Sequence, residues 1–197
     1  MNKHTIIEQL TALAEKYRIA LDVGILERIV KISSIRIIEN GSIIQHIGDK
    51  ADTAALILEG TIRCYYIDDD GNDITRGFSV KGTLCMDEGM FGYDESLTEW
   101  ETLTDTTLMI FKVDEIKKLI KQNDRLNEAY IQLLENALKY KIYRENGFLM
   151  ESASERYIHF RKLFPEICHT VKQQYIATYL GIAPESLSRI KKGLKDG

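Results

Sequence analysis

The sequence predicts an α+β fold in three parts: a β jelly-roll (double-stranded β-helix), one long helix and a C-terminal helix-turn-helix. Short β-branched and aromatic runs, broken by turn residues, occupy residues 35–113 and are typical of an all-β domain. Residues 124–150 contain no proline and no glycine before Gly147, which predicts an uninterrupted helix. Residues 171–194 contain two short apolar patterns separated by Gly181, which predict two short helices.

The segments before the long helix follow the same logic. Apolar residues at helical spacing predict two helices, within residues 6–17 and 23–30. Turn signals then recur at short intervals, and Asp70-Gly71-Asn72 between two β-branched runs predicts a hairpin tip. Many short strands with few helices favour a jelly-roll or barrel. Asp114 is expected to cap a short helix that follows the last strand.

Two apolar stripes run along residues 124–150. One has the alternating spacing of a coiled-coil seam, and we assign it to a dimer interface; its residues are Leu126, Tyr130, Leu133, Ala137 and Tyr140. The other consists of Ile131, Leu134, Leu138 and Ile142. One stripe suffices to pack a helix on its own domain, so two stripes predict contact with the same helix of a second copy about a two-fold axis. A helix buried between two parts of one chain would also need two stripes.

The C-terminal segment carries the signals of a helix-turn-helix. Thr170 and Gln173 are expected to form a capping box for its first helix, and Gly181 to adopt a positive φ at the turn. Pro184 suits the first position of the second helix, although Ala183 is a weak N-cap. One small core is expected from Ile176, Leu180, Ile182, Leu187, Ile190 and Leu194.

The second helix of this motif carries polar residues opposite Leu187, and that face would meet the major groove of DNA. Arg189 can bind guanine with two hydrogen bonds, and Glu185 can accept one from cytosine. Lysines would mostly contact phosphate. The expected DNA-binding residues are Lys172, Gln173, Glu185, Ser186, Ser188, Arg189, Lys191 and Lys192. The alternatives are an exposed Glu185–Arg189 ion pair without further function, and terminal helices that bind a protein instead of DNA.

The charge distribution agrees with DNA binding. The net charge is −4, but the residues from Glu151 onward hold eight basic and five acidic side chains, so the rest of the chain is strongly acidic. A basic terminal segment on an acidic body suits approach to phosphate.

Three well-separated cysteines without a C-x-x-C pair favour free thiols in a reducing cytosol. With no signal-peptide core and no apolar run near 20 residues, we expect a cytoplasmic protein without a membrane partner.

Enzyme function is not expected. The sequence has no P-loop, no nucleophile elbow and no H-E-x-x-H motif, and we assign no catalytic residue. A metal enzyme of the cupin type, built on a similar β architecture, needs several histidines, but His46 is the one histidine of four that lies in the β region. We therefore expect no metal and no cofactor.

The run from Gly181 to Arg189, GIAPESLSR, resembles the recognition-helix signature of the Crp/Fnr superfamily of bacterial transcription regulators. The order of the three parts is similar to that family over nearly the whole chain. The resemblance implies a cyclic-nucleotide-binding-like sensor domain with N-terminal helices over 1–123, a dimerisation helix over 124–150 and a DNA-binding domain over 151–197. It implies a homodimer that binds palindromic promoter DNA, with RNA polymerase as a further partner. Pro184 stands where many members carry arginine.

The resemblance also places an effector pocket, whose small-molecule effector stays unidentified. Family members that bind cyclic nucleotides use a Gly-Glu pair and an Arg-Ser or Arg-Thr pair, where this sequence has Met86-Asp87 and Thr98-Glu99. Between Lys81 and Lys112 it has seven acidic residues and no basic one, which would repel a phosphodiester, so we expect no cyclic AMP binding. The expected pocket residues are Cys85, Asp87, Glu88, Thr98, Glu99 and Trp100.

Cys85 leaves other kinds of sensor open. Cys85-Met86-Asp87 resembles the Cys-Met-His run of the family's haem-containing carbon monoxide sensors but lacks the histidine. A haem-based or thiol-based redox or gas sensor is therefore an alternative. A buried strand cysteine without reactivity is the simpler interpretation, because no basic residue nearby would lower the pKa of its thiol.

Overall fold

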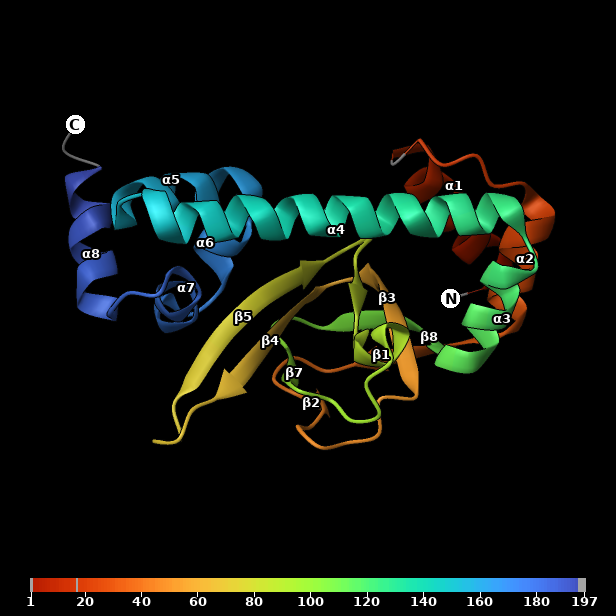
Figure 1. Cartoon of the computed structure of the whole chain (residues 1–197), viewed down its shortest axis with the longest axis horizontal. Coiled ribbons are helices and arrows are strands. Elements are labelled where there is room, and N and C mark those ends of the chain that lie inside the picture. The colour runs from red at the N-terminus through yellow and green to blue at the C-terminus, as the bar shows by residue number, and fades with distance from the viewer. Residues whose placement is uncertain (1, 17, 195–197) are drawn as a thin grey trace. The chain divides into compact units, whose positions relative to one another are not determined.

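The computed structural model describes residues 2–16 and 18–194, which divide into two compact units (Figure 1). The first comprises Met1–Cys64 and Phe78–Leu134, and the second Tyr65–Gly77 and Glu135–Gly197. The long helix α4 (Asp124–Met150) has the expected bounds and begins in the first unit and ends in the second. The tip of the β4–β5 hairpin also belongs to the second unit, whereas the sequence had placed it with the other strands.

The strands of the described residues form two four-stranded sheets, which confirms the expected β architecture. One sheet has the order β1 (Ser33–Ile38), β8 (Thr106–Lys112), β3 (Thr53–Glu59) and β6 (Leu84–Cys85). The other has the order β2 (Ile43–Gln45), β7 (Glu99–Thr102), β4 (Thr61–Ile67) and β5 (Asp73–Val80). Strand β8 pairs antiparallel with both β1 and β3 and is central to its sheet.

The two faces of β3 bury different cores because successive side chains of a strand point to opposite sides. Leu56 and Leu58 join a cluster with helices α1 (Lys3–Lys16), α2 (Val23–Lys31) and α3 (Val113–Lys121). Ala55 and Ile57 face the other way, into a cluster with residues of β4, β6, β7 and β8. The first unit therefore has a helix layer and an apolar interior within the β domain.

Local capping of α3 differs from the expectation. The helix begins at Val113 with Lys112 as its N-cap, so Asp114 lies inside the first turn and is not the cap. Asp114 and Glu115 both occupy that turn, where a negative charge is favoured by the helix dipole. No helix in the described part of the chain is both long and apolar enough to cross a bilayer.

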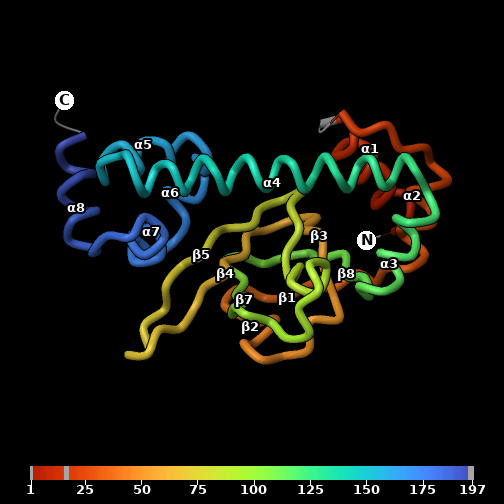
Figure 2. Tube along the Cα trace, in the orientation of Figure 1, coloured from red at the N-terminus to blue at the C-terminus, as the bar shows by residue number. Residues whose placement is uncertain are grey.

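Four helices follow α4: α5 (Ala153–Leu163), α6 (Ile167–Thr170), α7 (Gln173–Leu180) and α8 (Pro184–Gly193) (Figure 2). The expected capping box at α7 is wrong, because Thr170 ends α6 and donates a hydrogen bond to the Glu166 carbonyl at 3.0 Å. Lys172 occupies the N-cap position of α7, and its side chain makes no capping hydrogen bond. At α8, Ala183 is the N-cap and Pro184 the first helical residue, as expected.

Candidate functional site

Helices α7 and α8 share a small core around a tight turn. Gly181 has a φ of 67°, in the left-handed region that favours glycine, and its N–H donates to the Thr178 carbonyl at 3.1 Å. Ile176 of α7 and Leu187 of α8 are both 0% exposed. Leu194, which was expected in this core, lies one residue beyond α8 and is 38% exposed.

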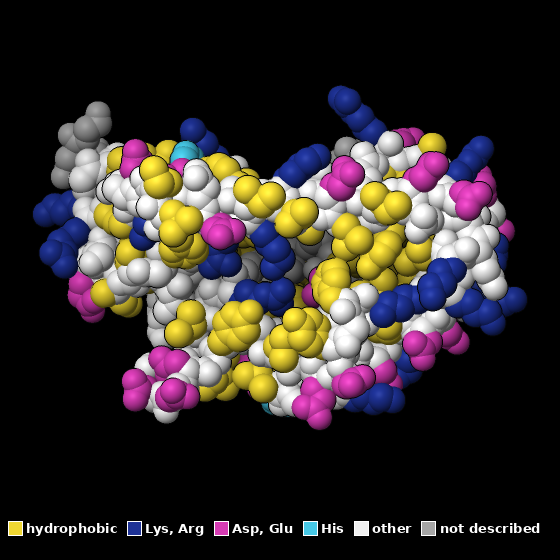
Figure 3. All heavy atoms as spheres, in the orientation of Figure 1, with side chains coloured by type: hydrophobic (Ala, Val, Ile, Leu, Met, Phe, Trp, Pro, Cys, Tyr) yellow, Lys and Arg dark blue, Asp and Glu magenta, His cyan; other side chains and the backbone are white. Residues whose placement is uncertain are grey.

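The face of α8 opposite Leu187 is polar and open to solvent. Glu185, Ser188, Arg189 and Lys192 are exposed, and Ser186 and Lys191 are half-buried. In Figure 3, Lys and Arg side chains gather over α8. The Arg189 Nε donates to the main-chain carbonyl of Glu185 at 3.4 Å. Among the described residues, the two side chains form no ion pair, so both charged groups face solvent.

The remaining residues of the expected interface lie at the start of α7. Lys172 and Gln173 are both exposed. Gln173 accepts a hydrogen bond from the Lys191 Nζ at 2.7 Å, which ties α7 to α8. The fold therefore brings all eight residues of the expected DNA-binding set onto α8 and the start of α7.

Helix α4 uses its two apolar stripes differently from the assignment made above. Leu126 is 7% exposed and belongs to the core of the first unit, and Tyr130 packs against that core. Leu133 is half-buried, and the Tyr140 hydroxyl lies 2.6 Å from the Tyr179 hydroxyl of α7. Ala137 alone of this stripe is exposed. Leu126, Tyr130 and Tyr140 are therefore engaged within the chain.

The second stripe remains uncovered. The side chains of Ile131, Leu138 and Ile142 are 47%, 58% and 57% exposed, and Leu149 is 74% exposed. At about 100° per residue, these four positions lie within about 20° of one line along the helix. Leu134, beside this line, is half-buried. Ile131, Leu138, Ile142 and Leu149 therefore form one exposed apolar line on α4, while Tyr143, Phe148 and Met150 are exposed on other sides of the helix.

Half of the residues of the expected effector pocket meet at one buried carboxylate. Glu88 lies in the short 3-10 helix η1 (Glu88–Phe91) and is 3% exposed. Its Oε1 accepts hydrogen bonds from the Thr98 Oγ1 at 2.6 Å and from the Trp100 Nε1 at 3.3 Å. Cys85 and Trp100 belong to the apolar interior of the β domain, and Asp87 is half-buried just before η1.

Two further charged contacts in the β domain join residues far apart in the sequence and were not expected from it. Glu99, the remaining residue of the expected pocket, accepts from the Ile47 N–H at 3.0 Å and lies 3.0 Å from the His46 Nδ1. Arg63 of β4 is fully buried, and its Nη2 lies 2.8 Å from the Glu101 carboxylate. The acidic run between Lys81 and Lys112 contains no basic residue, but one of its carboxylates, Glu101, is therefore paired with an arginine from outside the run.

Cys85 and Met86 enter the β-domain interior side by side. Burial, together with the charge of Asp87, raises the pKa of the Cys85 thiol well above its ordinary value. A protonated thiol is a poor nucleophile and a poor haem ligand. Met86 is 4% exposed and has a φ of 52°, a left-handed conformation that is rare for residues other than glycine. This is the position where the resemblance places the glycine of the Gly-Glu pair.

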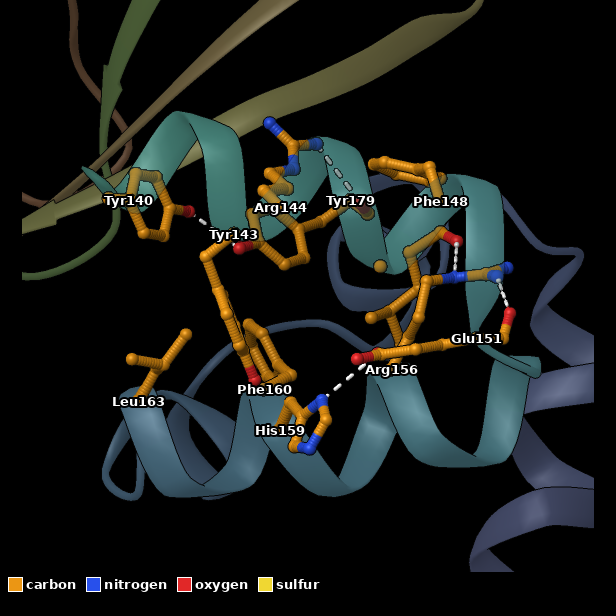
Figure 4. Close-up of a pocket in the computed structure, with 12 residues that line it drawn as sticks. Tyr140, Tyr143, Arg144, Phe148, Glu151, Arg156, His159, Phe160, Leu163 and Tyr179 are labelled. Atoms are coloured by element: carbon orange, nitrogen blue, oxygen red, sulfur yellow. Dashed lines mark hydrogen bonds and ion pairs between the residues drawn. The ribbon is translucent and has the colours of Figure 1, made fainter. Parts of the chain in front are cut away.

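A second cluster, in the second unit, was missed by the sequence analysis. Aromatic residues and two arginines of α4, α5 and α7 surround a cavity of about 30 Å³ (Figure 4). That space suits one or two water molecules. The lining residues of α4 have their partners on α5 and α7, so local sequence patterns do not reveal the cluster.

Comparison with known proteins gives a family match for the β domain and solved structures with a similar fold. Residues 35–123 match the family described as the cyclic nucleotide-binding domain. No curated protein sequence matches the chain. The regulator CLP of Xanthomonas campestris, described as c-di-GMP-responsive, is 18% identical with a TM-score of 0.72, over 89% of this chain and 92% of that one.

Two other solved structures give the same result. FixK2 of Bradyrhizobium japonicum is 17% identical with a TM-score of 0.72, over 84% of this chain and 85% of that one. A Crp/Fnr family regulator of Eubacterium rectale, described as putative, is 19% identical with a TM-score of 0.68, over 89% and 84%. At these identities the comparison shows a shared fold, which this chain has in common with regulators that include one described as Crp/Fnr.

Proposed function

We propose that the chain is a transcription regulator of the Crp/Fnr type that binds palindromic promoter DNA as a homodimer and reads bases with α8. The observation that carries the proposal is the exposed row of Glu185, Ser188 and Arg189 on a helix whose opposite face buries Leu187 completely. A helix anchored on one side by its core is held rigidly enough to present such a row to the major groove.

The side chains of this row match the chemistry of base edges. The Arg189 guanidinium can donate two hydrogen bonds to guanine O6 and N7, and the Glu185 carboxylate can accept from cytosine N4. Lys172 and Lys192 are exposed beside them and supply contacts to phosphate, which add affinity without sequence choice. Because neither Arg189 nor Glu185 is engaged in an ion pair among the described residues, both are available for these bonds.

The proposed dimer uses the exposed stripe of α4. Ile131, Leu138, Ile142 and Leu149 present apolar side chains on one face, and the same helix of a second copy would cover them about a two-fold axis. Two recognition helices about one turn of duplex apart, roughly 34 Å, would then read the two halves of a palindrome.

An Arg189→Ala variant tests base reading. We expect its affinity for a site selected from random duplexes to fall by about 5- to 150-fold, which corresponds to the loss of ~1–3 kcal/mol for a bidentate base contact. Affinity for unrelated duplex should change far less, because phosphate contacts remain. Fluorescence anisotropy at one fixed salt concentration measures both quantities.

The matched control is Arg161→Ala, which removes an exposed arginine of α5 outside α7 and α8. It should lose little specific affinity. If both variants bind the selected site equally well, α8 does not read bases. If no duplex is enriched by the wild-type protein, the terminal helices bind another kind of partner, and a protein becomes the better candidate.

The β domain is not proposed to bind cyclic AMP. Its expected pocket holds the buried carboxylate of Glu88, and Thr98 and Trp100 already donate to that carboxylate. A phosphodiester placed beside it would add like-charge repulsion to the cost of desolvation. The same reasoning covers cyclic dinucleotides, to which the related regulator CLP is described as responsive. The raised pKa of the buried Cys85 thiol also disfavours a thiolate-based sensor.

A further inference from the structure

Two arginines from different helices hold the end of α7. Arg144 of α4 donates through its Nη2 to the Tyr179 carbonyl at 3.1 Å, and Arg156 of α5 donates through its Nε to the Leu180 carbonyl at 3.3 Å (Figure 4). The last carbonyls of a helix have no partner within the helix. A cation is favoured there by the helix dipole as well as by the hydrogen bond. Both contacts lie directly before the Gly181 turn that leads into α8.

Aromatic rings add to the contact made by Arg144. Its guanidinium carbon lies 4.3 Å from the centroid of the Tyr179 ring and 5.3 Å from that of Phe148. Such cation–π contacts are strongest when they are shielded from water, and Arg144 is half-buried. Among the described residues, its guanidinium makes no ion pair with a carboxylate. The cation is therefore held by carbonyl groups and aromatic rings.

Strand β5 also contacts α7. The Thr178 Oγ1 of α7 lies 2.9 Å from the Thr75 Oγ1 and accepts from the Thr75 N–H at 3.2 Å. Arg144 joins this contact too, because its Nη1 donates to the Arg76 carbonyl. One arginine thus connects α4, β5 and α7 within the second unit.

Arg144 lies on the side of α4 away from the exposed stripe. At about 100° per residue, its position is about 140° around the helix from the line through Leu138, Ile142 and Leu149. The same turns of helix therefore present the proposed dimer surface on one side and hold α7 on the other. A change in the angle between α4 and α7 would move α8 by the same rotation, because α7 and α8 share a core.

We propose that Arg144 is a positioning residue for DNA reading: it sets the angle of the α7–α8 pair on α4 and so the separation of the two α8 helices in the dimer. The inference rests on the proposed function and deepens it. In this proposal Arg144 acts through Tyr179 and β5 and does not contact DNA. Its loss should therefore affect the choice of half-site spacing and leave the reading of one half-site unchanged.

The test compares full-length wild type with Arg144→Met on a panel of duplexes. The panel contains the selected palindrome, versions with one or two base pairs added or removed between the half-sites, and a single half-site. Wild type should prefer one spacing. For Arg144→Met, the affinity ratio between that spacing and its neighbours should fall at least threefold, while single half-site affinity stays within about twofold. Arg144→Lys should be intermediate, because a lysine keeps the charge but loses the planar donor pair.

Arg125→Met provides the matched control, since Arg125 is an exposed arginine of the same helix whose guanidinium lies 3.9 Å from Asp22. It should keep the wild-type spacing ratio. Circular dichroism and sedimentation check folding and dimer formation; if Arg144→Met does not fold, Arg144→Lys carries the spacing test. An unchanged ratio in the variant, or an equal loss on every duplex including the half-site, would overturn the positioning role. Absence of any duplex binding by wild type would instead overturn the proposed function itself.

Discussion

Met86 combines two features that rarely coincide, a left-handed backbone and a buried long side chain. Its φ of 52° costs a residue with a Cβ about 1–2 kcal/mol, yet the side chain fills the interior beside Cys85 and Trp100. Burial of the thioether therefore offsets the backbone cost. Glycine would relieve the backbone but leave the interior unfilled.

This balance predicts an inverted order of stability for two variants. Met86→Ala should lower the free energy of unfolding by about 2–5 kcal/mol, because it removes buried atoms and keeps the strained backbone. Met86→Gly should be less destabilising by about 1 kcal/mol, because glycine adopts a positive φ freely. Urea unfolding measures both. The same pair at Met109, which is 0% exposed and has an ordinary φ, should show glycine as the worse residue. The same order at both positions would contradict this account.

At the scale of one element, α4 shows how two similar stripes acquire different roles. Leu126 and Tyr130 meet the core of the first unit, and Tyr140 meets Tyr179. Leu138 and Ile142 are more than half exposed. Since an exposed apolar stripe of this length is costly in water, the helix gains most from a partner on that side.

We expect Leu138→Lys to convert the dimer to monomer in sedimentation experiments, because it places a charge in the proposed seam. The free energy of unfolding of the monomer should change by no more than about 0.5 kcal/mol, since the side chain is exposed. The control Asn136→Lys adds the same charge at an exposed position about 160° around the helix. A Leu138→Lys protein that stays dimeric, together with a Tyr130→Ala protein that dissociates, would restore the first stripe as the interface.

At the scale of the whole molecule, basic and acidic residues are unevenly distributed along the chain. The segment from Glu151 onward has an excess of basic residues, while the chain as a whole has a net charge of −4. Figure 3 shows acidic side chains gathered at the tip of the β4–β5 hairpin, where Asp68, Asp69 and Asp70 lie. The acidic segment of the β domain continues this pattern from Asp87 to Asp105. The excess of basic residues thus lies in the segment that contains α8, and the run from Lys81 to Lys112 in the β domain has seven acidic residues and no basic one between its ends.

We therefore expect millimolar cyclic AMP to leave the melting temperature of the protein unchanged. A ligand that binds the native state must raise it by mass action, so the absence of a shift at saturating concentration indicates absence of binding. The control is sodium chloride at the same ionic strength, which isolates screening from binding. A rise that depends on cyclic AMP concentration and exceeds the salt effect would refute the charge argument.

The sequence by itself determined the fold class, the bounds of α4, the residues of the exposed α8 face and the roles of Gly181 and Pro184. These features follow from local periodicity and from backbone preferences of single residues, which a sequence displays directly. Tertiary structure decided which α4 stripe stays exposed, which groups bond Glu88, and that Arg63 meets Glu101. It also decided that Arg144 holds the end of α7. These features depend on contacts between residues far apart along the chain. Several side chains of the same chemical type could make each contact, and only packing selects which one does.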